Sequence, residues 1–277
     1  MVDMLQSRGY MRIPYPSDVR IALQRAVDSW ERFCALDAKI KQSVPYMRRD
    51  QLGVGYECKL ESGKGKDRKE NLHVMIAMMQ EFEAIARHLD LAPLHELLRD
   101  AHMLIGALSA PMLALARELE HHYKLHGLER EMLRSRPEWM VRFIHYFGDQ
   151  EAGSEIASAH ADKSGLTSHL YESDHGFEYL DHRGRWRRLA FNRASMMLLP
   201  DMQMQYRSKG ELKALWHRVV ATEQTAKHGR VSIVCFMSLL ATPVVDKSRI
   251  GRLQDMSPGF NYEMPFAEFA KLFVKEK

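Results

Sequence analysis

Apolar residues in the first half of the chain recur at the three- and four-residue spacing of an amphipathic helix. Two stretches show this spacing, residues 18–36 and residues 94–123. In the longer stretch the repeating positions are Leu97, Ala101, Leu104, Leu108, Met112, Leu115 and Leu119. Pro111 lies inside it, and we expect this proline to kink the helix or to start a second one. Residues 39–69 are polar and contain four glycines, which predicts a solvated loop.

The pattern changes after Pro137, where short runs of aromatic and β-branched residues begin. The first run covers residues 139–147 and has the composition of a strand. The other runs are residues 167–171, 177–180, 185–189, 195–199, 216–221 and 231–239. His182-Arg183-Gly184 falls between two of them and predicts a hairpin turn. Helices followed by many short strands predict an α+β fold with a mainly β core, on which the helical region packs.

Composition narrows the class of protein. The chain has 277 residues, and its 40 Lys+Arg against 36 Asp+Glu leave a net charge of +4, too small for a nucleic-acid-binding surface. No apolar run is long enough to cross a membrane, and the first residues lack the pattern of a signal peptide. Three cysteines without a CxxC spacing predict free thiols. We therefore expect a cytoplasmic protein that binds neither nucleic acid nor membranes.

Two His-x-Asp triplets offer candidate metal ligands. In a strand, residues i and i+2 project from the same face, whereas in a helix they point in nearly opposite directions. His88 and Asp90 lie in a helical stretch, so we expect them to be surface residues. His160 and Asp162 lie among the expected strands, so both side chains can reach one ion.

Three later residues fit the same site. His217 lies on another expected strand, where it is either a third ligand or an ordinary core histidine. Two histidines and one carboxylate occupy one face of an octahedral ion and leave the other positions open, as in non-heme Fe(II) oxygenases. Arg230 and Ser232 share a face of the last expected strand, and a guanidinium beside a hydroxyl suits a bound carboxylate. This pair favours the metal site over the core histidine.

In their order along the chain, these residues resemble the isopenicillin N synthase-like family of Fe(II)/2-oxoglutarate-dependent dioxygenases. The matching segments are His160-Ala161-Asp162 with Thr167, Gly176-Phe177-Glu178-Tyr179-Leu180, Gly184-Arg185-Trp186, Pro200-Asp201, His217-Arg218-Val219 and Arg230-Val231-Ser232. Two positions depart from the family pattern: Pro200 stands in place of a glycine, and Phe147-Gly148 replaces a proline-containing pair. The resemblance covers most of the chain and is looser before Glu151.

The resemblance implies a fold and a division of the chain. It implies a double-stranded β-helix, or jelly roll, with an N-terminal helical region packed on it. On this basis residues 1–136 form the helical and loop region, residues 137–240 the jelly-roll core, and residues 241–277 a C-terminal extension.

The resemblance also implies site residues. Fe(II) would be bound by His160, Asp162 and His217. 2-Oxoglutarate would be bound through Arg230 and Ser232, with Tyr146 either a further contact or a core aromatic. Tyr56 and Phe236 are candidate substrate contacts, and no catalytic residue is expected beyond the metal ligands.

The implied reaction couples oxidative decarboxylation of 2-oxoglutarate to succinate and CO2 with the oxidation of a C–H bond. The substrate is expected to be a small molecule, O2 the oxidant and hydroxylation the default outcome. The expected state is a monomer or a weak homo-oligomer. Two alternatives remain open: an oxidase of the isopenicillin N synthase or amino-cyclopropane oxidase type that does not use 2-oxoglutarate, and a non-catalytic binding module on the same fold.

Overall fold

Two long amphipathic helices form the base of the structure, a computed structural model that describes residues 2–49, 52–60 and 68–239. Helices α2 (Ser17–Cys34) and α5 (Ala92–Tyr123) pack against each other, as the spacing of their apolar residues predicts. Helix α5 is not divided at Pro111. Leu108 and Met112 on either side of this proline are fully buried, so packing of both turns outweighs the missing backbone hydrogen bond.

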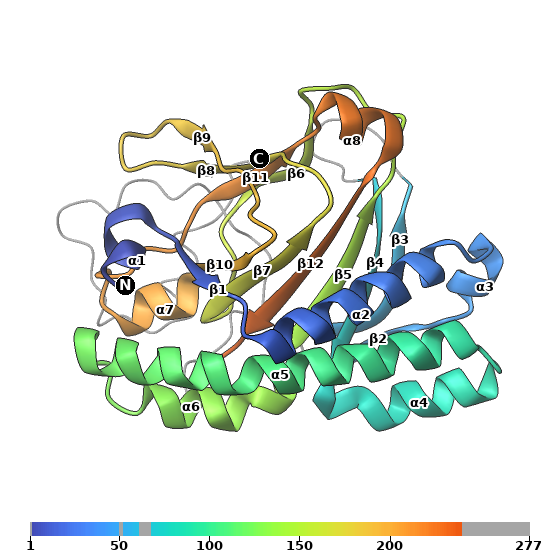
Figure 1. Ribbon diagram of the computed structural model, residues 1–277, viewed down its shortest axis with the longest axis horizontal. Coiled ribbons are helices and arrows are strands. Elements are labelled where there is room, and N and C mark those ends of the chain that lie inside the picture. Colours follow the sequence, from blue (N-terminus) through green and yellow to red (C-terminus); the bar gives the residue numbers. More distant parts are fainter. Residues whose placement is uncertain (1, 50–51, 61–67, 240–277) are drawn as a thin grey trace.

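The other helices are short and complete the same layer or connect strands (Figure 1). They are α1 (Asp3–Arg8), α3 (Ala38–Gln42), α4 (Met79–His88), α6 (Leu128–Ser135), α7 (Met202–Arg207) and α8 (Glu223–His228), with single 3-10 turns at Ile76–Met78 and Arg136–Glu138. Among the helices of the described ranges, none is long and apolar enough to cross a membrane.

The strands form two antiparallel sheets. The large sheet has, in spatial order, β1 (Met11–Pro14), β10 (Ser195–Pro200), β7 (Leu166–Glu172), β12 (Arg230–Met237), β5 (Met140–Tyr146), β4 (Lys69–Met75), β3 (Leu52–Lys59) and β2 (Tyr46–Arg49). The small sheet has the order β6 (Glu155–His160), β11 (His217–Val220), β8 (Phe177–Leu180) and β9 (Trp186–Arg188). Each strand expected after Pro137 is present, and the hairpin at 182–184 joins β8 to β9.

The polar stretch 39–69 contains two strands, so the expectation of a loop is wrong there. Strand β3 pairs with β2 on one side and with β4 on the other. The glycines have a steric reason, because a Cβ on Gly53 would overlap the ring of Tyr46 on the neighbouring strand. Glycine at this position makes room for the ring on the neighbouring strand. It makes the sequence look less like a strand, but the strand still forms.

The large sheet also joins the two regions that the sequence separates at residue 136. Strand β4 from the first region pairs with β5 from the second along its whole length, from Lys69↔Tyr146 to Met75↔Met140. The first 136 residues therefore supply strands as well as helices to the sheet. The extension over residues 241–277 lies outside the described residues.

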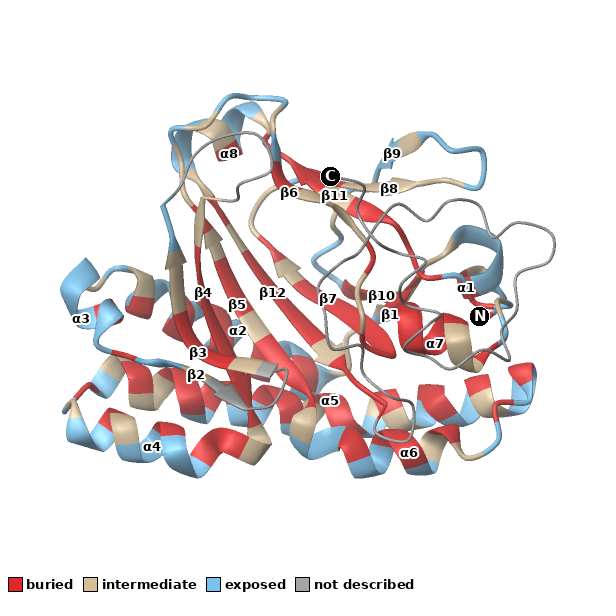
Figure 2. Ribbon diagram, turned by 180° about the vertical axis from the view of Figure 1, so that it is seen from behind, coloured by how far each residue is buried: buried red, intermediate tan, exposed pale blue. Residues whose placement is uncertain are grey.

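The two faces of the large sheet have different roles. On β5 and β12, Val141, Phe143, Ile233 and Cys235 belong to the main hydrophobic core, against the helices. The alternate residues face the small sheet, since successive side chains on a strand point to opposite faces. Figure 2 shows the resulting buried band between the helical layer and the strands. One face of the large sheet is thus packed against the helices, and the opposite face is available for a functional site.

Candidate metal centre and its cavity

Three side chains converge where strands β6 and β11 lie side by side. His160 ends β6, His217 begins β11, and the two residues are paired in register with ring centroids 4.5 Å apart. Asp162 follows β6 by two residues, and its Oδ1 and Oδ2 lie 3.5 Å from Nε2 of His160 and 3.8 Å from Nε2 of His217. One ligand atom from each residue lies within 4.8 Å of the other two. This is the set that the sequence predicts.

Backbone carbonyls orient both imidazole rings. Nδ1 of His160 lies 2.6 Å from the carbonyl oxygen of Ser158, and Nδ1 of His217 lies 2.9 Å from that of Leu215. A carbonyl oxygen can only accept a hydrogen bond, so each Nδ1 carries the proton and each Nε2 presents a lone pair. Both Nε2 atoms therefore face Asp162 in the form that binds a metal.

Burial sets the charge of this group. Burial, together with the neighbouring His160, lowers the pKa of His217 to about 3, so His217 is neutral at neutral pH. Burial alone would raise the pKa of Asp162, but the two histidines outweigh it, and the net shift is downward. The group thus combines two imidazoles, of which His217 is kept neutral, with one carboxylate. This donor set fits a divalent transition metal such as Fe(II).

A buried carboxyl group holds the loop that carries Asp162. The hydroxyls of Ser164 and Thr167 both donate to Oδ2 of Asp201, the second at 2.8 Å. The backbone N–H of Met202 donates to the carbonyl oxygen of Asp162 at 3.0 Å. Burial and the nearby Asp162 raise the pKa of Asp201. Thr167 and Asp201 belong to the segments that match the family pattern, and the structure shows that they position the loop after His160.

The metal-ligand group opens into a cavity of about 340 Å³ between the two sheets. Strands β4, β5, β7 and β12 form one wall, and β6 and β11 form the other. The lining residues are Lys69, Arg142, Ile144, Tyr146, Ala157, Ser158, His160, Asp162, His169, Glu172, His217, Val219, Arg230, Ser232, Val234 and Phe236. The volume is that of a small-molecule site.

Arg230 lies deep in this cavity beside a carboxylate. Its side chain is 1% exposed, and its Nη2 lies 2.8 Å from Oε2 of Glu172, which is equally buried. Nε donates to the carbonyl oxygen of Asp174 at 3.1 Å. A guanidinium has five N–H donors, more than these two contacts use. An incoming carboxylate could accept from it.

Glycine permits this arrangement of strands. Gly229, directly before Arg230, has φ +81°, and a Cβ there would lie 2.6 Å from the carbonyl oxygen of Tyr146. A larger residue would force β12 away from β5 at the point where the arginine enters the cavity.

Comparison with known proteins agrees with this site. A family model described as the 2OG-Fe(II) oxygenase superfamily matches residues 138–239, which include both histidines, the aspartate and Arg230. Residues 138–239 form a 2OG-Fe(II) oxygenase domain. The protein is therefore an Fe(II)- and 2-oxoglutarate-dependent dioxygenase. No curated protein sequence matches the chain.

Solved structures show the same fold as this dioxygenase at low sequence identity. An oxygenase from Shewanella oneidensis is 20% identical with a TM-score of 0.68, over 90% of this chain and 88% of that one. The dioxygenase for auxin oxidation 1 from Arabidopsis thaliana, solved with 2-oxoglutarate, is 17% identical with a TM-score of 0.71, over 88% of each chain. A Neurospora crassa protein in complex with alpha-KG is 15% identical with a TM-score of 0.70, over 87% and 79%.

The remaining expected residues of the dioxygenase divide into two groups. Ser232, Tyr146 and Phe236 line the cavity with Arg230. Tyr56 does not, because it is buried in the main core against Phe33 and donates to Glu70. Tyr56 is therefore excluded as a substrate contact.

Four lining residues with titratable side chains escaped the sequence analysis. They are Lys69, Arg142, His169 and Glu172. Side chains alternate along β5, so Arg142 and Tyr146 lie on the same face of the sheet. This alternation could have predicted Arg142 as a lining residue from the sequence. His88 and Asp90 of the second His-x-Asp triplet are exposed, as expected.

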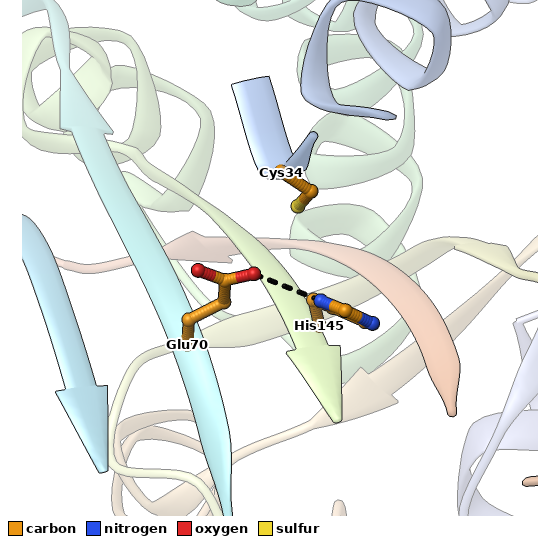
Figure 3. A group of neighbouring side chains, drawn as sticks. All are labelled: Cys34, Glu70 and His145. Carbon is orange, nitrogen blue, oxygen red and sulfur yellow. Dashed lines mark hydrogen bonds and ion pairs between the residues drawn. The ribbon is translucent and has the colours of Figure 1, made fainter. Parts of the chain in front are cut away.

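The dioxygenase contains a second cluster with metal-ligand side chains, Cys34, Glu70 and His145 (Figure 3). It lies on the opposite, helix-facing side of the large sheet. Glu70 accepts from Tyr56 at 2.7 Å and lies 2.9 Å from Nδ1 of His145 and 2.7 Å from Nζ of Lys41. The lysine ammonium already balances the charge of this carboxylate. This cluster is a buried ion-pair network.

Proposed function

We propose that Fe(II) binds to His160, Asp162 and His217, and that the enzyme hydroxylates a C–H bond of a small molecule. In this reaction 2-oxoglutarate and O2 become succinate and CO2, and one oxygen atom enters the substrate. The two sheets are, in this proposal, the walls of a jelly roll. The observation that carries the proposal is the pair of backbone-fixed imidazoles whose Nε2 atoms face one carboxylate beside a cavity.

The chain's own groups have distinct tasks. When bound, Fe(II) and 2-oxoglutarate supply the activation of O2 and the oxidising power. His217 remains neutral through burial, so its Nε2 is available without the loss of a proton. Arg230 and Ser232 bind the distal carboxylate of 2-oxoglutarate, with the guanidinium of Arg230 as the charged donor. Tyr146 closes this end of the site with its ring 5.8 Å from the guanidinium carbon.

Apolar side chains line part of the cavity and would limit the access of water there. Ile144, Val234 and Val219 line it from both sheets. Water exclusion protects a reactive oxidant from side reactions and strengthens the ion pairs at Arg230. The small volume favours a small-molecule substrate over a macromolecule.

The test is succinate formation. The protein is incubated with Fe(II), ascorbate, O2 and 2-oxoglutarate, with and without candidate small molecules. We expect succinate in proportion to O2 consumed, and more of it when a substrate is present. O2 consumption without succinate would contradict the proposed use of 2-oxoglutarate and favour an oxidase of the isopenicillin N synthase type.

A further inference from the structure

Arg142 is a cation in the cavity wall whose charge the described residues do not balance. It lies on β5 two and four residues before Ile144 and Tyr146, and all three line the cavity. Its Nε is buried without a hydrogen-bond partner. Within residues 2–49, 52–60 and 68–239, no carboxylate forms an ion pair with it. The ring of Phe236 lies 4.7 Å from its guanidinium carbon.

Three other charged groups of the cavity have partners of their own. Asp162 lies against two histidines, and Glu172 and Arg230 lie against each other. A buried cation without a counter-ion costs free energy, so a protein keeps one where a ligand supplies the missing charge. Arg142 as a whole is half-buried, but its Nε is fully buried and no counter-ion lies beside it among the described residues.

Arg142 is too far along the sheet to share the ligand of Arg230. In the β5–β12 register, Arg230 is paired with Tyr146 and Arg142 with Val234. The two positions are four residues apart on β5, about 13 Å along a strand. Their guanidinium groups lie over different rings, Tyr146 and Phe236. The cavity wall therefore carries two guanidinium groups at separate positions.

Two polar side-chain atoms near Arg142 also have no hydrogen-bond partner among the described residues. Asn71 and His73 on β4 pair in register with Ile144 and Arg142. Oδ1 of Asn71 and Nε2 of His73 are buried without a partner. Polar atoms without partners are rare in a folded interior, and here they gather beside one arginine.

We propose that Arg142 binds a carboxylate of the primary substrate, so that the enzyme acts on small carboxylic acids with an apolar body. This inference rests on the proposed function, which assigns Arg230 to 2-oxoglutarate. The planar guanidinium offers two parallel donors to a carboxylate, and Phe236 and Val234 supply apolar contact for the remainder of the molecule. Because 2-oxoglutarate takes part of the 340 Å³, the body is as small as one ring or a short alkyl chain.

The experiment compares acids with their neutral amides. Mn(II) replaces Fe(II), so that ligands bind without turnover, and thermal unfolding is followed. The probes are phenylacetate, 3-phenylpropanoate, indole-3-acetate and hexanoate, each beside its primary amide. We expect at least one acid to raise the unfolding midpoint while its amide does not. Arg142→Gln should weaken that acid about 10- to 100-fold, the loss of a charge-assisted hydrogen bond.

Two further variants make the result specific. Arg142→Lys keeps the charge and should bind the acid with intermediate affinity, which guards against a folding defect in Arg142→Gln. Arg230→Gln should lose the stabilisation by 2-oxoglutarate and keep that by the acid. Amides that bind as well as acids, a panel in which no acid binds, or an acid shift that survives Arg142→Gln would each overturn the proposal. If 2-oxoglutarate fails to stabilise the wild-type protein, the proposed function is what has failed.

Discussion

In the described part of the chain, two clusters of potential metal ligands have equally close ligand atoms and yet differ in chemistry. In the first, His160, Asp162 and His217 have their ligand atoms within 4.8 Å of one another. In the second, Cys34, Glu70 and His145 satisfy the same limit. Proximity of ligand-type atoms therefore does not distinguish a metal site from a structural network.

What distinguishes the clusters is how much of their hydrogen-bonding capacity the fold already uses. Backbone carbonyls take only the Nδ1 atoms of His160 and His217, which leaves both Nε2 atoms available. Glu70, by contrast, is in contact with Lys41, Tyr56 and His145 at once. The first cluster also opens into a cavity between two sheets, whereas the second lies on the helix-facing side of the large sheet.

Removing a ligand of the first cluster should have the largest effect. His160→Ala or His217→Ala leaves two protein ligands, which do not define one face of an octahedral ion. We expect succinate formation to fall below detection in both variants. His88→Ala is the matched control, because His88 belongs to the exposed His-x-Asp triplet, and it should retain wild-type turnover. Equal rates for the His88 and His217 variants would refute the assignment.

Substitution of Arg230 should have the next largest effect on activity. Arg230→Lys keeps a charge but loses the planar pair of donors, and each charge-assisted hydrogen bond contributes about 1.5–3 kcal/mol. We expect KM for 2-oxoglutarate to rise about 10- to 100-fold, on the same principle. Ser232→Ala removes a neutral bond of about 1 kcal/mol and should raise it about fivefold. The reverse order of these two effects would count against Arg230 as the carboxylate partner.

Glu172 sharpens the comparison because its carboxylate competes for Arg230. Glu172→Gln removes a negative charge beside the site for 2-oxoglutarate, so the cosubstrate should bind more tightly, on the order of fivefold or about 1 kcal/mol. The buried arginine loses its counter-ion, and the free energy of unfolding should fall by about 1–3 kcal/mol. Isothermal titration with Mn(II)-loaded protein and urea unfolding measure the two changes. Weaker binding of 2-oxoglutarate would show that Glu172 supports Arg230 and does not compete for it.

The second cluster should affect stability only. Burial would raise the pKa of Glu70, but His145, Lys41 and Tyr56 lower it to about 2. A carboxyl group whose pKa is lower in the folded state stabilises the fold above its ordinary pKa of about 4.5, and this contribution disappears as the pH falls toward about 2. Glu70→Gln should therefore cost about 1–3 kcal/mol at pH 7 and less at low pH, with turnover unchanged. A loss of iron binding in this variant would contradict the structural role.

The sequence predicted the site better than the surroundings of the site. Alternation along the last strand correctly placed Arg230 beside Ser232, because that inference needs only local geometry. Asp162 lies near His160 as expected, but it follows the end of β6, so the loop after the strand and not strand alternation brings the two together. The partner of Arg230 was not predictable, since Glu172 reaches it from β7 through pairing between strands distant in the chain. Tyr56 was misjudged for the same reason, because only the packing of α2 on the sheet buries it against Phe33. Strand β3 was missed because its glycines accommodate Tyr46, a contact between strands.

The most direct test of the metal-site assignment measures how much Fe(II) each chain binds. Metal-free protein is dialysed without O2 against Fe(II), and bound metal is measured for the wild type, His217→Ala and His145→Ala. The two variants each remove one histidine, from the first and the second cluster respectively. We predict one Fe(II) per chain in the wild type and in His145→Ala, and none in His217→Ala. Iron that remains in His217→Ala and is lost from His145→Ala would contradict the central claim.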